Sequence, residues 1–193
     1  MASLILSGDT SGSITVAAPA VAGSTTQTLV AATGTLAPLI SGTSVSASGT
    51  SVDFTSIPSW VKRITVMFQG VSTNGTNNLQ LQIGAGSVTT SGYSSYAQIF
   101  NSATLTNTGT VTTGFVIWTA TATDTKTGVY TLALLTGNTW VCTGNASQSS
   151  SQSSQTSGSI ALAGTLDRLR IIGSATGSPS DTFDAGTINI LYE

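Results

Sequence analysis

The chain has 193 residues, of which 39% are hydrophobic and only 6% charged, and its formal net charge is −2. Soluble domains usually carry about 25% charged residues, and disordered chains combine low hydrophobicity with high net charge, so we predict a folded chain with a surface of hydroxyl and amide groups. The absence of histidine and the single cysteine exclude Ser-His-Asp and Cys-His nucleophiles, histidine metal sites and an intramolecular disulfide.

The first segment, residues 1–38, has short apolar runs, no aromatic residue and almost no charge. We predict short strands at 4–6, 13–16 and 27–30, each bounded by glycine or proline. A segment of this composition cannot build a core of its own, so it must pack on a partner chain, on the following domain or on a particle surface. The side chains predicted to make this attachment are Leu4, Leu6, Ile14, Val16, Val21 and Leu29.

The second segment, residues 39–193, consists of short alternating runs separated by glycine, asparagine or serine. This pattern is typical of a sandwich or barrel, and no window has the apolar period of a helix. We predict an all-β fold, an antiparallel β-sandwich with jelly-roll-like topology. The predicted strands are 43–47, 50–54, 62–71, 78–84, 96–100, 113–119, 128–135, 139–142, 159–162, 167–173 and 185–192.

Alternation within three of these strands assigns their buried faces. The strands 62–71, 167–173 and 185–192 have apolar residues at every second position, so we expect them to be neighbours in one core sheet. Trp60 is predicted to close the end of the sandwich, and Cys142 to be a small buried apolar residue. The predicted core residues are Trp60, Ile64, Val66, Phe68, Trp118, Leu169, Ile171, Ile188 and Ile190.

Two polar segments contain candidate ligand contacts. Tyr93 and Tyr96 lie in a polar stretch broken by glycine, where an aromatic ring can stack on a sugar. Residues 147–158, SQSSSQSSQTSG, contain no apolar side chain and are predicted to form an exposed loop, either a contact tip or a tolerated insertion. The candidate ligand contacts are Tyr93, Tyr96, Gln148 and Gln152.

The acidic residues offer little catalytic or metal-binding chemistry. Asp167, Asp181 and Asp184 are the clustered acids, and two carboxylates are the minimum for glycoside hydrolysis or a weak calcium site. Asp181 and Asp184 lie beside Pro179 and Gly186, where aspartates usually bond their own backbone in turns. We therefore predict no enzymatic activity, no cofactor and no metal site.

The basic residues gather in two predicted strands, where they form either a contact patch or cross-strand ion pairs that fix the register. Their small number argues against a nucleic-acid partner. The sequence begins without a secretory signal pattern, and no apolar run approaches 18 residues, so we expect no membrane insertion. The basic residues concerned are Lys62, Arg63, Arg168 and Arg170.

Several longer stretches resemble a known class of protein. SIPSWVKRIT (56–65), GVSTNGT (70–76), Gly92-Tyr93 and DTFDAGTINILY (181–192) resemble the C-terminal β domain of tail-fibre-like virion proteins of tailed bacteriophages, a resemblance that covers 42–84 and 159–193. Short motifs within the N-terminal segment are also similar to N-terminal repeats of phage tail fibres. They lie at 11–16, 19–23, 28–29 and 33–35.

The resemblance implies a homotrimeric, non-enzymatic appendage in the virion, assembled in the host cytoplasm. Its N-terminus would dock on another virion protein, and its β domain would meet host surface polysaccharide. The alternative is a capsid-bound decoration or head-fibre protein, which would be present in far more copies per particle. A soluble carbohydrate-binding module is a third reading, and it predicts a stable monomer.

Overall fold

The structure, a computed structural model, describes residues 3–7, 11–17, 37–101, 105–119, 121–149 and 151–193. The chain divides into two units, Met1–Leu36 and Ala37–Glu193, two residues from the boundary expected after residue 38. The described residues form strands and turns, so the all-β prediction is confirmed. Within these ranges, no helical segment has the length and apolarity needed to cross a membrane.

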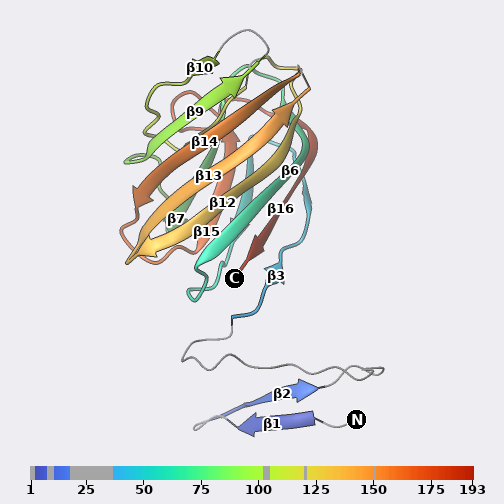
Figure 1. The fold of residues 1–193 in the computed structure, drawn as a ribbon, viewed down its shortest axis with the longest axis vertical. Helices are drawn as coiled ribbons and strands as arrows, with labels where there is room; N and C mark the ends of the chain where they lie inside the picture. The colour runs from blue at the N-terminus through green and yellow to red at the C-terminus, as the bar shows by residue number, and fades with distance from the viewer. Residues whose placement is uncertain (1–2, 8–10, 18–36, 102–104, 120, 150) are drawn as a thin grey trace. The chain divides into compact units, whose positions relative to one another are not determined.

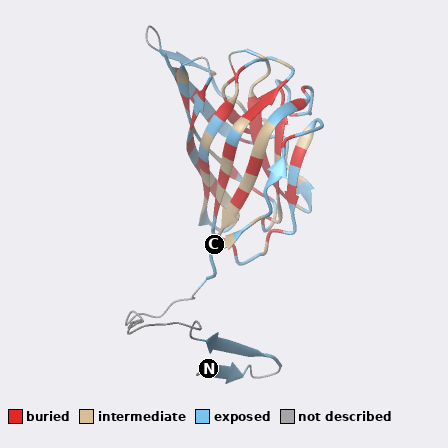
Figure 2. Ribbon diagram, turned by 90° about the vertical axis from the view of Figure 1, so that its right-hand side faces the viewer, coloured by how far each residue is buried: buried red, intermediate tan, exposed pale blue. Residues whose placement is uncertain are grey.

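The first unit contains an antiparallel ribbon of two strands, β1 (Ser3–Ser7) and β2 (Ser13–Ala17). Leu4 pairs with Val16 and Leu6 with Ile14, and because side chains alternate along a strand these four lie on one face. All four are between 53% and 68% exposed, and Figure 2 colours β2 as exposed along its length. Two further residues predicted to serve in attachment, Val21 and Leu29, lie outside the described residues.

The second unit consists of two antiparallel sheets (Figure 1). The larger sheet runs in the order β10 (Leu105–Asn107), β9 (Ser94–Phe100), β14 (Gln152–Ala161), β13 (Thr139–Gln148), β12 (Lys126–Thr136), β6 (Arg63–Thr73), β16 (Phe183–Tyr192) and β3 (Ile40–Ser41), and β4 (Val45–Ser46) also pairs with β16. The smaller sheet runs in the order β11 (Phe115–Ile117), β7 (Leu79–Ala85), β15 (Arg168–Gly173) and β5 (Ser51–Thr55), and β8 (Ser87–Val88) pairs with β7.

The pairing of the strands is nested in the manner of a jelly roll. The outermost strands β3 and β4 pair with β16, then β5 with β15, β6 with β12 and β7 with β11. Successive pairs fall alternately in the larger and the smaller sheet, which is the arrangement that two interlocked Greek keys produce. The predicted jelly-roll-like sandwich is therefore the observed topology.

Two insertions extend the larger sheet beyond this framework, and we refer to the part that they add, β9, β10, β13 and β14, as the extended sheet. β9 and β10 are inserted between β7 and β11, and β13 and β14 form a hairpin between β12 and β15. The two insertions meet because β14 pairs with β9 over seven residue pairs, from Ser153 opposite Phe100 to Ser159 opposite Ser94. In Figure 1 these strands continue the larger sheet away from β6 and β16.

The core lies between the two sheets, and Figure 2 shows the alternation of buried and exposed residues along their strands. β6 and β16 pair directly, as expected from their matching apolar faces, but β15 lies in the facing sheet. Alternation identifies the buried face of a strand. It is the same whether two strands are neighbours in one sheet or face each other across the core, so it could not place β15. The buried residues in these strands include Ile64, Val66, Phe68, Leu169, Ile171, Ile188 and Ile190.

Both tryptophans predicted for the core require correction. Trp60 is 37% exposed, and its ring centroid lies 6.0 Å from that of Tyr192. Ile57 and Val61 on either side of it are buried instead, so the smaller apolar residues of this turn fill the end of the sandwich. Trp118 is half-buried at the end of the apolar run that forms β11.

The serine-rich segment 147–158 is not a loop, contrary to prediction. It forms the facing ends of β13 and β14, joined through a turn in which Ser151 has a φ of 61°. Ser154 and Thr156 face inward and are buried, and the Thr156 hydroxyl donates a hydrogen bond of 2.6 Å to the Val116 carbonyl oxygen. Small hydroxyl side chains thus take the inward positions where β11 crosses the extended sheet.

A buried lysine lies at the start of β12. Lys126 is 1% exposed, and its amino group lies 3.5 Å from the carbonyl oxygen of Asp124. Its cross-strand partner Gln148 is 5% exposed, and neither polar atom of the Gln148 amide has a hydrogen-bond partner among the described residues. Burial lowers the pKa of Lys126 to about 8, and the nearby charge of Asp124 only partly offsets this effect.

Burial of Lys126 predicts a pH-dependent stability. Below pH 8 the ammonium is charged in both states, so the folded state bears the full cost of burying it. As the pH rises from about 8 to 10.5 the folded state loses this proton first, and we expect the Lys126 contribution to stability to rise by on the order of 3 kcal/mol.

Urea unfolding of wild type and Lys126→Met across pH 7–10.5 measures this contribution. The burial that raises the pKa of Cys142 and of Tyr130 acts equally in both proteins, so their difference isolates Lys126. We expect Lys126→Met to be the more stable protein at pH 7 and its advantage to shrink as the pH rises. An advantage that is constant across this range contradicts the assignment.

Candidate functional site

The outer face of the extended sheet has a hollow of about 380 Å³, lined by side chains of β9, β10 and β14. We refer to it as the outer-face hollow. It contains one aromatic ring, three amides and one hydroxyl, and no charged side chain lines it. The lining residues are Tyr96, Gln98, Asn107, Gln155 and Ser157.

The register of three strands arranges these side chains in rows. Gln98 pairs with Gln155 on one side and with Asn107 on the other, so three amides cross the sheet side by side. Tyr96 pairs with Ser157 in the neighbouring outward row. Inward residues of β9 alternate with these outward ones, and Ala97 between Tyr96 and Gln98 is fully buried.

Tyr96 is held from one side by the chain that follows β10. The Thr110 hydroxyl donates a hydrogen bond of 2.5 Å to the Tyr96 hydroxyl. That segment is tied to β9 by Thr108, whose N–H donates to the Ala97 carbonyl oxygen at 3.0 Å and whose hydroxyl accepts from the Ala97 N–H at 3.1 Å. Tyr96 nevertheless remains 46% exposed, so its ring is both positioned and accessible.

Of the four candidate ligand contacts, the structure places Tyr96 in the outer-face hollow and the others elsewhere. Tyr93 is 2% exposed and belongs to the core, and Gln148 faces inward beside Lys126. Gln152 is half-buried at the start of β14 and does not line the hollow. Tyr93 and Gln148 are therefore corrected to interior residues.

Sequence reasoning missed four residues of the hollow: Gln98, Asn107, Gln155 and Ser157. Gln98 could have been predicted to share the outward face with Tyr96, because it follows Tyr96 by two residues in the alternating run SSYAQIF. Gln155 and Ser157 lie in the segment mistaken for a loop, and only the pairing of β14 with β9 brings them beside Tyr96.

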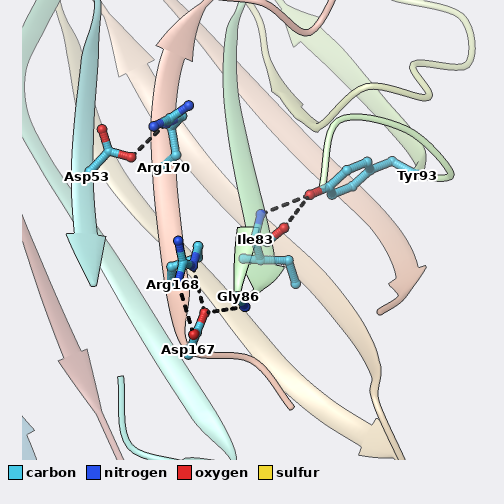
Figure 3. Close-up of polar contacts among 7 residues, drawn as sticks. All are labelled: Asp53, Ile83, Gly86, Tyr93, Asp167, Arg168 and Arg170. Atoms are coloured by element: carbon cyan, nitrogen blue, oxygen red, sulfur yellow. Dashed lines mark hydrogen bonds and ion pairs between the residues drawn. The ribbon is translucent and has the colours of Figure 1, made fainter. Parts of the chain in front are cut away.

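Tyr93 serves the core through its hydroxyl (Figure 3). The Ile83 N–H donates to the Tyr93 hydroxyl at 2.8 Å, and the carbonyl oxygens of Ile83 and Thr89 lie 3.2 Å and 3.0 Å from it as acceptors. The Tyr93 ring packs edge-on against Phe115 with centroids 5.1 Å apart. Burial raises the pKa of this phenol well above its usual range, so it stays neutral.

The clustered acids are engaged in structural hydrogen bonds. Asp181 is 6% exposed and accepts from the Asn77 N–H at 3.0 Å and from the Asn77 side-chain amide at 2.7 Å. Asp184 accepts from the Ser72 hydroxyl. Among the described residues, no group of three or more acidic, cysteine or histidine side chains comes together in a way that could hold a metal ion.

The charged residues of the smaller sheet form ion pairs rather than an unpaired patch (Figure 3). Arg170 on β15 lies directly opposite Asp53 on β5, with Nε 2.6 Å from Oδ1, so this pair spans two strands. Arg168 binds Asp167 at 2.7 Å, and this contact, with the Gly86 N–H, holds the pKa of Asp167 below its usual value. The cross-strand interpretation thus describes Arg170, whereas Arg168 pairs with its neighbour in the sequence and links no two strands.

Comparison with known proteins adds no relative. No family model matches the sequence, and neither the curated proteins nor the solved structures give a significant match. The function must therefore be argued from the fold and from the outer-face hollow.

We expect loss of the hydroxyl to destabilise the fold at Tyr93 and to have almost no effect on stability at Tyr96. Tyr93→Phe leaves the Ile83 N–H without its buried acceptor, and we expect it to destabilise the fold by about 1–3 kcal/mol. Tyr96→Phe, at an exposed position on the same domain, should change stability by less than about 0.5 kcal/mol. Urea unfolding of both variants checks this, and equal destabilisation would contradict the placement of Tyr93.

Proposed function

We propose that this protein is a non-enzymatic structural component of a bacteriophage particle, a trimeric tail-fibre-like appendage. In this proposal the N-terminal unit docks on the particle and within the trimer. The jelly-roll domain is presented to the host surface, where the outer-face hollow makes the contact. The observation that carries the proposal is the apolar face of the β1–β2 ribbon.

The ribbon has an apolar face that its own two strands do not cover. Leu4, Leu6, Ile14 and Val16 share this face through the pairing of β1 with β2, and each is more than half exposed. An isolated two-stranded hairpin is at best marginally stable in water, and such a ribbon gains stability when its apolar face packs on another surface. A second and third copy of the chain supply that surface in a closed, symmetric assembly.

The jelly-roll domain supports the same proposal at the level of fold. Jelly rolls are common in viral capsid proteins and in lectins, although a fold by itself does not determine function. The domain also has a polar, accessible hollow on the outer face of the larger sheet, which does not contribute to the core. Its carboxylates at Asp167, Asp181 and Asp184 are bound to neighbouring groups, which favours a binding role over hydrolysis.

The trimer is tested by the light-scattering mass of the 193-residue chain and of two variants. Leu6→Ser/Ile14→Ser removes a cross-strand pair from the apolar face, whereas Ile5→Ser changes an equally exposed residue on the opposite face. We expect a trimer for wild type and Ile5→Ser and a monomer for Leu6→Ser/Ile14→Ser.

Circular dichroism of the same samples shows whether the β domain remains folded in each variant. A monomeric wild-type chain contradicts the proposed appendage and favours a free binding module. A trimer that persists in Leu6→Ser/Ile14→Ser contradicts the role of the apolar face.

A further inference from the structure

We propose that the outer-face hollow binds a short, uncharged oligosaccharide. The Tyr96 ring would support one sugar ring, and the neighbouring amides would bond its hydroxyls. This inference rests on the proposed function, since it names the class of host-surface ligand that the appendage would contact. It also assigns the contact to residues from three strands.

The aromatic part of the hollow suits a sugar. A pyranose has weakly apolar C–H faces and a rim of hydroxyl groups, so it is bound well by an aromatic side chain flanked by polar groups. Tyr96 is 46% exposed and is fixed at its hydroxyl by Thr110. A ring that is already positioned loses little conformational freedom when a ligand stacks on it.

The amide row supplies the matching polar groups. Gln155, Gln98 and Asn107 lie side by side on adjacent strands, which are about 4.8 Å apart. Each amide both donates and accepts hydrogen bonds, as each sugar hydroxyl does. In the described part of the chain, the side chains of Gln98 and Gln155 make no hydrogen bond to another residue, so both are available to a ligand.

The charge distribution selects an uncharged ligand. An anionic sugar loses hydration on binding and needs a cation or several strong donors in return. No basic residue lies on β9, β10 or β14. The five basic residues of the chain are Lys62 just before β6, Lys126 in the interior, and Arg63, Arg168 and Arg170, which pair with Glu193, Asp167 and Asp53.

The size and polarity of the hollow favour a sugar over a protein partner. Protein interfaces concentrate their binding energy in apolar and aromatic side chains that become fully desolvated. Here a single ring is surrounded by amides and a hydroxyl. A volume of about 380 Å³ falls in the range of small-ligand sites, and the open sheet surface allows a chain of sugars to continue beyond it.

Affinity electrophoresis of the 193-residue chain in native gels tests the inference. The gels contain one of the uncharged polymers dextran, mannan or galactan, or one of the acidic polymers polysialic acid or alginate. We expect at least one uncharged polymer to retard wild type, and neither acidic polymer to do so. Tyr96→Ala should weaken the retardation about tenfold or more, and Tyr96→Phe, which keeps the ring, by less than about threefold.

Val129→Ala is the matched control, because Val129 is an exposed outward residue of β12 on the same sheet, outside the hollow. It should bind as wild type does. Retardation by none of the uncharged polymers, retardation by the acidic ones alone, or unchanged binding by Tyr96→Ala each overturns the inference. A trimer that binds no polymer refutes this inference alone, whereas a monomer that binds through Tyr96 refutes the appendage alone.

Discussion

The pairing of β9 with β14 is the interaction on which the extended sheet and the outer-face hollow both depend. The jelly-roll framework places the two insertions at the same edge of the larger sheet, beyond β12. Their contact then aligns Tyr96 with Ser157 and Gln98 with Gln155. Without this pairing, the polar outward residues of the two insertions would not lie side by side.

The inner face of the same pairing explains why serine and threonine are so frequent there. The Val116 N–H donates to the Ser95 hydroxyl at 3.0 Å, and the Val116 carbonyl oxygen accepts from the Thr156 hydroxyl. β11 is thus bound to the extended sheet through side chains as well as through its pairing with β7. In β14, a composition typical of a loop thus encodes a strand that hydrogen-bonds to β11 on one face and presents the Gln155 amide on the other.

Much of the framework could be predicted from the sequence, because alternation in β6, β15 and β16 reports directly on burial. Alternation does not report which strands pair. The prediction that β15 lies beside β6 was therefore wrong, and β15 lies in the facing sheet. Alternation fails where both faces of a strand are buried: on β7, Gln80 and Gln82 are as buried as Leu81. Gln82 donates to the carbonyl oxygens of Thr113 and Gly177, contacts that depend on loops distant in sequence.

The candidate site was less predictable than the framework. Tyr93 and Tyr96 occupy similar polar surroundings in the sequence, yet a backbone acceptor and donor at Ile83 draws Tyr93 inward. Gln155 and Ser157 lie on the partner strand β14, in a serine-rich stretch without apolar side chains. The exposure of the apolar residues on the β1–β2 ribbon, in contrast, follows from a segment that lacks the bulk to form a core, and their role in attachment stays a prediction.

The central claim, that β9 and β14 pair in this register, is tested most directly by cross-linking. In the double variant Gln98→Cys/Gln155→Cys the two Cα atoms should lie about 4.5–5.5 Å apart, within the range that a disulfide spans. Mass spectrometry after mild oxidation should detect this disulfide. In Gln98→Cys/Asn145→Cys the second cysteine is two strands away, about 10 Å, and the thiols should stay free. Absence of the 98–155 disulfide, or equal cross-linking in both variants, would contradict the account.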